Sequence, residues 1–129
     1  MGASWQQWAL VMAGGALGAA GRFWLGGSLI RQFGERMPWG TLAANFIGAF
    51  AIGFLAEFLL ERGQAAMYWR AFLMIGLLGA LTTYSSVMLE LLVLTRNGRT
   101  GAAALYLGIT LVGGMLLVWA GARFGALFR

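Results

Sequence analysis

The chain has 129 residues, of which 60% are hydrophobic and 10% are charged, and its formal net charge is +5. This composition leaves too little polar surface for a water-soluble fold, and it suits a bilayer, which requires spans of roughly 20 apolar residues. Histidine, cysteine, lysine and aspartate are absent, which argues against thiol, redox and zinc enzymes. The nine arginines are spread along the chain and form no patch suited to nucleic acid.

Four apolar segments are long enough to cross a membrane, at about residues 8–30, 39–60, 71–94 and 101–122. We expect the first to be retained as a span, because no basic segment precedes it and no clear cleavage site follows. The connecting loops are short, so residues 1–129 are expected to form a single domain with both termini on one side. The chain is predicted to be an all-α integral membrane protein with four transmembrane helices.

The first span contains small residues and one arginine. Gly14 and Gly18 lie four residues apart, a spacing that lets a second helix approach closely. Arg22 has two interpretations: its long side chain reaches towards the interface, or its charge draws anions into a vestibule.

The second span begins after Pro38, since proline is tolerated in the first turn of a helix. Thr41 and Asn45 lie four residues apart and share one face. Phenylalanines also recur at every fourth position of this span, at Phe46, Phe50, Phe54 and Phe58. We interpret this row as packing against lipid or a neighbouring helix, with pore lining by positive ring edges as the alternative.

The third span is interrupted by a glycine- and hydroxyl-rich stretch from Gly76 to Ser86. Irregular backbone at membrane depth survives only where it is buried in protein or lines an ion site or polar cavity. A break in the third helix is therefore expected, and it indicates passage of an ion or solute. Beyond it, Glu90 is a buried functional carboxylate, or its side chain reaches towards the interface, or it pairs with Arg96.

Three spans carry a polar stripe at helical spacing. Besides Thr41 and Asn45 on the second span, the third span has Thr82 or Thr83, Ser86 and Glu90, and the fourth has Tyr106 and Thr110. Each single residue has a structural explanation, because hydroxyls bond back to their own helix and Asn45 can join two helices. Taken together, the stripes favour a polar pathway across the membrane.

Arginines are balanced between the two sides of the predicted bundle. Four lie on the side of the termini and second loop and four on the side of the other loops, with Arg22 inside the first span. The positive-inside rule then sets little preference. Both a single orientation with a weak bias and insertion in both orientations, followed by antiparallel pairing, remain open.

Three motifs closely resemble the Fluc/CrcB fluoride channels of bacteria: GGALGAAGRF at 14–23, PWGTLAANFIG at 38–48 and GLLGALTTYSS at 76–86. The likeness covers nearly the whole chain, in order and at the right spacing. It implies an antiparallel, dual-topology homodimer in the bacterial cytoplasmic (inner) membrane, with two narrow pathways for passive fluoride export. It also implies a structural sodium ion at the dimer centre, held by the backbone carbonyls of Gly79 and Thr82 from each subunit.

The resemblance assigns further residues to the fluoride pathway. Asn45 matches an asparagine that donates its side-chain amide to fluoride. Six residues match hydroxyl and carboxyl positions of the polar track: Thr41, Ser85, Ser86, Glu90, Tyr106 and Thr110.

Two positions differ from the family pattern, which places phenylalanines three residues apart in the third helix. This chain has Tyr84 and Val87 there. Tyrosine keeps an aromatic edge, whereas valine removes a ring and its quadrupole. Three interpretations remain open. The pathway tolerates the loss of the ring, transport is slower or less selective, or a paralogous subunit supplies the ring in a heterodimer.

Other function classes account for less of the sequence. A small dual-topology coupled exporter has a similar size, but such exporters carry a glutamate in the first helix, which is missing here. A scaffold protein leaves the polar stripes unexplained. No nucleotide-binding motif is present, so the membrane potential, negative inside, is the expected driving force for an anion moving outwards.

Overall fold

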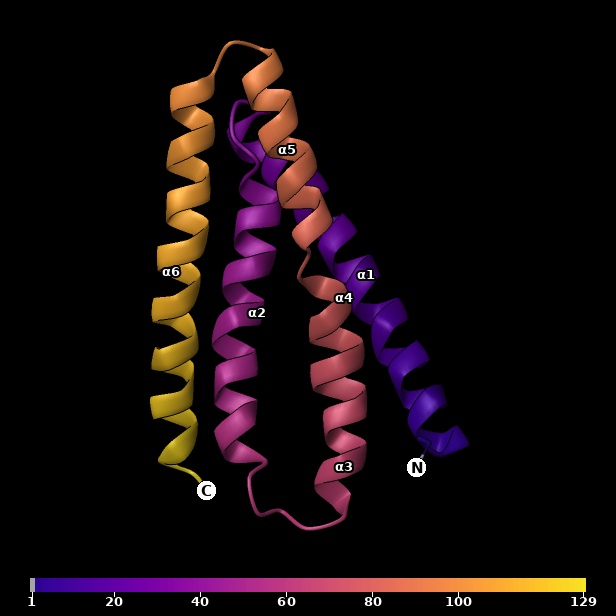
Figure 1. The fold of residues 1–129 in the computed structure, drawn as a ribbon. Coiled ribbons are helices and arrows are strands. Elements are labelled where there is room, and N and C mark those ends of the chain that lie inside the picture. The colour runs from indigo at the N-terminus through magenta and orange to yellow at the C-terminus, as the bar shows by residue number, and fades with distance from the viewer. Residues whose placement is uncertain (1) are drawn as a thin grey trace.

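The structure, a computed structural model, describes residues 2–129, and its regular elements are all helical. Four helical stretches are long and apolar enough to cross a membrane: Trp5–Phe33, Trp39–Phe58, Ala65–Arg96 and Thr100–Ala126. This confirms the predicted all-helical chain with four candidate spans. Both ends of the described chain lie at the same end of the bundle (Figure 1).

The first helix, α1 (Trp5–Phe33), starts and ends outside the apolar run predicted for it. Ser4 caps its N-terminus, because the Gln7 amide donates to Ser4 Oγ and the Ser4 amide donates to Gln7 Oε1, at 3.3 and 2.8 Å. Hydropathy marks the part of a helix that suits hydrocarbon, whereas capping decides where the helix begins. The predicted span therefore fell several residues short of each end.

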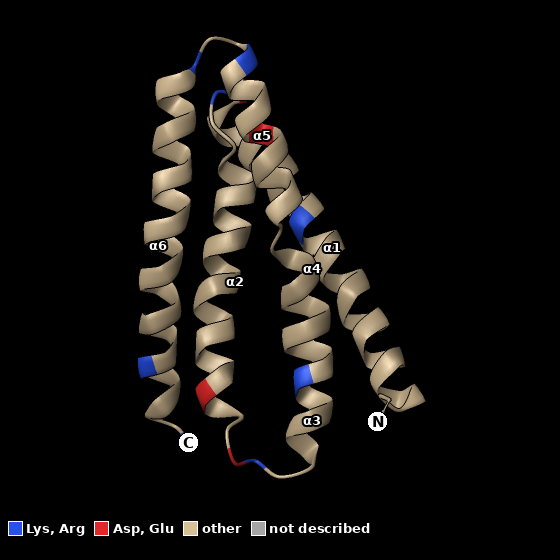
Figure 2. Ribbon diagram, in the orientation of Figure 1, with Lys and Arg blue, Asp and Glu red and all other residues tan. Residues whose placement is uncertain are grey.

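The bundle contains two closely packed helix pairs. Helix α2 (Trp39–Phe58) packs most extensively against α6 (Thr100–Ala126), and α1 packs against the π-helical segment η1 (Arg70–Leu78). In Figure 1, α2 and α6 run nearly parallel to one another, while α1 crosses the third helical stretch (Ala65–Arg96) at an angle. Charged residues gather near the two ends of the bundle, with few between them (Figure 2).

Small residues permit both pairs to approach closely. A Cβ on Gly14 or Gly18 of α1 would overlap the carbonyl oxygens of Phe72 and Leu77, and one on Gly121 of α6 would overlap that of Phe50. The phenylalanine row lies along the α2–α6 contact: the Phe50 and Phe54 rings are 6.1 and 5.7 Å from that of Phe124. Helix packing is thus the structural role of these rings.

The third stretch consists of α3 (Ala65–Trp69), η1, α4 (Gly79–Leu81) and α5 (Tyr84–Arg96). Thr82 and Thr83 alone separate α4 from α5, with extended backbone at φ/ψ of −84/154° and −154/127°. The non-helical part is shorter than the Gly76–Ser86 stretch marked in the sequence. Gly76 lies within η1, and its missing side chain permits close packing against α1, since a Cβ there would lie 2.8 Å from the Val11 carbonyl oxygen.

Candidate functional site

Asn45 of α2 holds the two-residue interruption between α4 and α5. Its Oδ1 accepts from the Thr83 amide at 2.8 Å, and its Nδ2 donates to the Thr83 carbonyl at 3.2 Å. One asparagine side chain therefore replaces the carbonyl that the Thr83 amide would meet inside a helix, and it adds a donor to the Thr83 carbonyl, which as N-cap also begins α5. The amide nitrogen carries two hydrogens, so a second donor remains on Nδ2.

The Thr83 side chain starts the helix that follows. Its Oγ1 accepts from the Ser86 amide at 3.2 Å, as an N-cap does, and lies 3.3 Å from Ser85 Oγ. The sequence named Thr83 only as an alternative to Thr82 on the polar stripe of the third span and assigned it no role. A threonine three residues before Ser86, at the end of a glycine-rich run, is the sequence signal for this cap.

These contacts release two backbone carbonyls. In an unbroken helix the Thr83 amide would donate to the Gly79 carbonyl and the Ser86 amide to the Thr82 carbonyl, because each bond joins residues four apart. Here those two amides donate to Asn45 and to the Thr83 side chain. The carbonyls of Gly79 and Thr82 therefore lose their helical partners at the interruption.

Two further residues fix the C-terminal end of α4. Arg22 of α1 donates from Nε to the Ala80 carbonyl at 3.1 Å, so its guanidinium contacts α4 just before the interruption. Thr82 donates from Oγ1 to the Leu78 carbonyl at 2.9 Å. Its methyl group lies where a Cβ on Gly48 of α2 would be, so only glycine fits at that position. Gly48 was not predicted as part of the site.

Glu90 joins three helices nearer the first and third loops. Oε1 accepts from Thr41 Oγ1 of α2 at 2.5 Å, and Oε2 accepts from the Tyr106 hydroxyl of α6 at 2.7 Å. Tyr106 is 1% exposed. This network shows that Glu90 bonds to hydroxyl groups inside the bundle, and that the interpretation in which it pairs with Arg96 is wrong.

Two cavities lie at either end of this hydroxyl network. The loop cavity, about 390 Å³, lies beside the first loop, and its lining includes Glu35, Arg36, Thr41 and Glu90. The midspan cavity, also about 390 Å³, lies beside the interruption and is lined in part by Asn45, Thr82, Thr83, Tyr84, Val87 and Thr110. Thr110 Oγ1 is buried and has no hydrogen-bond partner among residues 2–129. It lies one turn along α6 from Tyr106 and lines the midspan cavity.

The structure thus brings most of the predicted site residues into two groups. Thr41, Glu90 and Tyr106 form the first, and Asn45, Thr82, Tyr84, Val87 and Thr110 lie around the midspan cavity. Val87 is 4% exposed and packs in the core, whereas Tyr84 is 78% exposed on an open face of the chain. Four predicted site residues line neither cavity, although each lies beside the interruption or close to it: Arg22, Gly79, Ser85 and Ser86.

The comparisons with known proteins cover almost the full chain. The family model described as CrcB-like protein, Camphor Resistance (CrcB), matches residues 9–122. A relative from Xylella fastidiosa (strain 9a5c), named Fluoride-specific ion channel FluC, is 52% identical over 122 residues, 95% of this chain and 85% of the relative.

Two further relatives with the same name have lower sequence identity to this chain. One from Xanthomonas axonopodis pv. citri (strain 306) is 49% identical over 94% of this chain and 91% of its own length. Another from Agrobacterium fabrum (strain C58 / ATCC 33970) is 41% identical over 91% of this chain and 94% of its own. The resemblance drawn from the three motifs is confirmed, and the chain belongs to the CrcB-like protein family.

Proposed function

We propose that this chain forms a fluoride-selective ion channel, through which fluoride leaves the bacterial cytoplasm passively. Relatives that are 41 to 52% identical over nearly their whole length are named as fluoride-specific channels. The observation that carries the proposal is the hydrogen-bonded set of Thr41, Glu90 and Tyr106 beside the loop cavity, with Asn45 and Thr110 beside the midspan cavity. We infer a polar route for fluoride between these two groups.

The chemistry of this route suits a small, strongly hydrated anion. Fluoride gives up water only for donors placed close together, and a narrow path of hydroxyls and amides can replace its shell in steps. Hydroxyl hydrogens rotate, so the groups of Thr41 and Tyr106 that donate to Glu90 can turn towards a passing anion. The second Nδ2 hydrogen of Asn45 is a further donor beside the midspan cavity.

The test is fluoride efflux from liposomes that contain the purified protein, with a potassium gradient and valinomycin balancing the charge. Rapid release of fluoride without chloride supports a selective channel. Release that requires a proton gradient supports the coupled transporter instead. Absence of release from well-folded protein contradicts a homomeric channel, and restoration by a paralogous subunit would then identify a heterodimer.

The proposed active unit is an antiparallel homodimer in the inner membrane. The polar route within one chain runs only from the loop cavity to the interruption at mid-length, and the face beyond it is open. Tyr84 and Ile75 are 78% and 62% exposed on either side of the interruption. A second copy in the opposite orientation would cover such a face and continue the route to the other side of the membrane, giving two pathways related by symmetry.

The proposed sodium site fits the donors at the interruption. The carbonyls of Gly79 and Thr82 have lost their helical amides, and Gly79 is exposed, so two chains can bring four such oxygens together. Unwound backbone carbonyls are suitable ligands for sodium. The ion would hold the two interruptions in register. Replacing sodium by N-methylglucamine is expected to slow fluoride release and lower the thermal unfolding midpoint, whereas no change in either would contradict the site.

A further inference from the structure

A polar groove separate from the proposed pathway lies between the C-terminal ends of α2 and α6. Its volume is about 350 Å³, and its lining includes Glu57, Trp119, Arg123 and Arg129. The groove therefore combines two guanidinium groups, one carboxylate and one indole ring.

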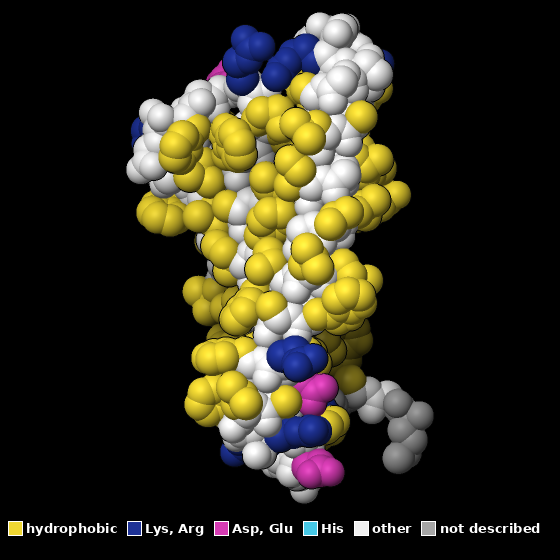
Figure 3. Space-filling view, turned by 90° about the vertical axis from the view of Figure 1, so that its left-hand side faces the viewer, with side chains coloured by type: hydrophobic (Ala, Val, Ile, Leu, Met, Phe, Trp, Pro, Cys, Tyr) yellow, Lys and Arg dark blue, Asp and Glu magenta, His cyan; other side chains and the backbone are white. Residues whose placement is uncertain are grey.

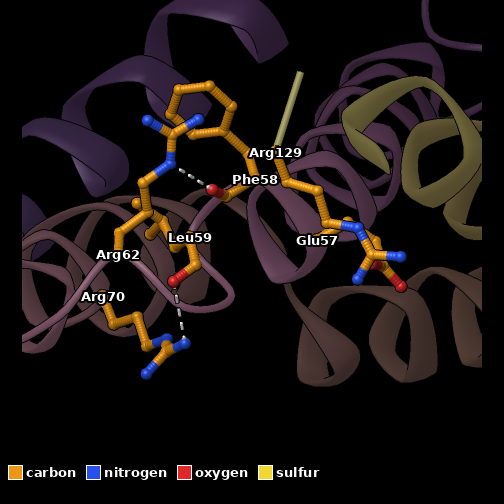
Figure 4. A network of polar contacts seen from close by, with 6 residues as sticks. All are labelled: Glu57, Phe58, Leu59, Arg62, Arg70 and Arg129. Carbon is orange, nitrogen blue, oxygen red and sulfur yellow. Dashed lines mark hydrogen bonds and ion pairs between the residues drawn. The ribbon is translucent and has the colours of Figure 1, made fainter. Parts of the chain in front are cut away.

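The other arginines at this end are already occupied. Arg62 donates to the Phe58 carbonyl at 3.0 Å and to the Phe128 carbonyl at 2.7 Å, and Arg70 donates to the Leu59 carbonyl at 3.2 Å. Figure 4 shows these side chains around the end of α2, where unpaired carbonyls need donors. Arg129 lies on the far side of the same end, with Nη1 3.2 Å from Glu57 Oε2.

The groove retains one cation without a partner. Arg123 is exposed, and its side chain has no hydrogen bond or ion pair within residues 2–129. Glu57 Oε2 is buried and faces Arg129 Nη1 at 3.2 Å, so the ion pair compensates its charge. The groove thus offers a free guanidinium at Arg123 beside the Arg129–Glu57 ion pair.

The position of the groove relates it to lipid. Figure 3 shows a broad hydrophobic band on this side of the molecule, with basic and acidic side chains gathered just beyond it. Trp119 is 61% exposed, and Val112, Met115 and Leu116 continue the same exposed face of α6 towards the middle of the span. Tryptophan favours the headgroup level, and the apolar stripe beside it suits an acyl chain.

We propose that this groove binds the headgroup of an anionic phospholipid of the phosphatidylglycerol type. The phosphate lies against Arg123 and Arg129. Two arginines and one glutamate give the groove a net positive charge, which complements a headgroup with a single negative charge. Arg123 also lies in the last turn of α6, where a cation stabilises the helix end, but that effect requires no second arginine.

The test compares lipids of identical acyl chains on the purified full-length protein, using native mass spectrometry to measure bound lipid. Phosphatidylglycerol is expected to bind more tightly than phosphatidylcholine, which has a phosphate but no net charge. Arg123→Gln is expected to weaken phosphatidylglycerol binding about fivefold, since one basic residue near an anionic surface contributes about 1 kcal/mol. Arg123→Lys is expected to keep most of the affinity.

Arg96→Gln is the matched control, because Arg96 is exposed at the opposite end of the bundle. Equal weakening by Arg96→Gln and Arg123→Gln, or equal binding of the two lipids, would overturn the proposal in favour of general surface charge. Displacement of the lipid by glycerol phosphate at the same concentration would identify a site for a free anion instead. None of these readouts depends on fluoride transport, so they are independent of the proposed function.

Discussion

At the scale of single residues, side chains at the interruption act mainly by taking over backbone hydrogen bonds. Asn45 pairs with both polar groups of Thr83, and Thr83 in turn caps α5. Buried backbone groups without partners cost free energy comparable to a lost hydrogen bond, and lipid offers none. The same contacts that stabilise the interruption also free the carbonyls of Gly79 and Thr82.

The first prediction concerns Asn45→Asp. Aspartate keeps an acceptor for the Thr83 amide but loses the donor to the Thr83 carbonyl and adds a negative charge beside the midspan cavity. We expect a loss of about 1–3 kcal/mol in the free energy of unfolding and at least about tenfold slower fluoride release, since a carboxylate repels an anion. Asn97→Asp, an exposed change in the third loop, is the control and should alter neither measurement.

The second prediction concerns the hydroxyl pair around Glu90. Tyr106→Phe leaves Glu90 Oε2 without its donor, so it should destabilise the protein by about 1.5–3 kcal/mol, the range for hydrogen bonds to charged groups. Combined with Glu90→Gln in a double-mutant cycle, it should show a coupling energy of about 0.5–3 kcal/mol. Strictly additive unfolding free energies would contradict a direct bond. Tyr68→Phe is a control outside the network.

At the scale of elements, glycines set the distance between paired helices. Gly121 of α6 faces the Phe50 carbonyl, and Gly53 of α2 faces the Val118 carbonyl, so α2 and α6 approach through small residues on both sides. Such contacts replace the hydrophobic effect as the driving force within lipid. The phenylalanine row and the glycines of α6 together fix how α2, and therefore Asn45 and Gly48, meets the interruption.

The third prediction compares two glycines of α6. A Cβ on Gly121 would overlap backbone atoms that cannot move independently, so Gly121→Ala should lower the free energy of unfolding by about 1–3 kcal/mol. Gly108 has no heavy atom within 4 Å of its Cβ position, so Gly108→Ala should be neutral or stabilise by up to about 1 kcal/mol through helix propensity. Thermal or denaturant unfolding in detergent would measure both, and similar effects of the two changes would refute the packing argument.

At the scale of the whole molecule, charge balance decides orientation. Four arginines lie towards the end with the termini, at Arg62, Arg70, Arg123 and Arg129, and four lie towards the other end, at Arg31, Arg36, Arg96 and Arg99. Figure 2 shows basic residues at both ends of the bundle. The positive-inside rule therefore favours neither orientation strongly, as an antiparallel dimer of one chain requires.

The fourth prediction tests this balance with a reporter at the C-terminus. The unchanged protein should place the reporter on both sides of the membrane. Changing Arg31 and Arg96 to glutamine leaves two arginines at the loop end and four at the end with the termini. The end with the termini should then stay in the cytoplasm, so the reporter should move to the cytoplasmic side. Fluoride release should fall, because few chains would remain in the opposite orientation to form antiparallel pairs. The control changes the same residues to lysine, which preserves the charge and should preserve both orientations. A reporter found on one side of the membrane in the unchanged protein would rule out dual insertion.

Apolar length and turn residues alone were enough to predict four helices and their order, because hydrocarbon demands about 20 apolar residues per span. The motifs were enough to predict the family. The ends of the helices were harder to predict from the sequence. Ser4 and Gln7 extend α1 through a local capping box, and a hydropathy pattern contains no information about capping. The polar site residues were predicted from stripes at helical spacing, which show which residues share a face and not which partner they meet.

Only the tertiary structure decided how these residues are used. Glu90 bonds to Thr41 and Tyr106 and not to an arginine, because helix packing brings α2 and α6 to its side of α5. Gly76 lies within η1 and packs closely against α1, and the interruption narrows to Thr82 and Thr83 because Asn45 and Gly48 meet it there. The sequence alone determined the membrane class, the four spans and the family, since these follow from composition and local pattern. Partners and packing came from the fold, since they join residues that lie far apart along the chain.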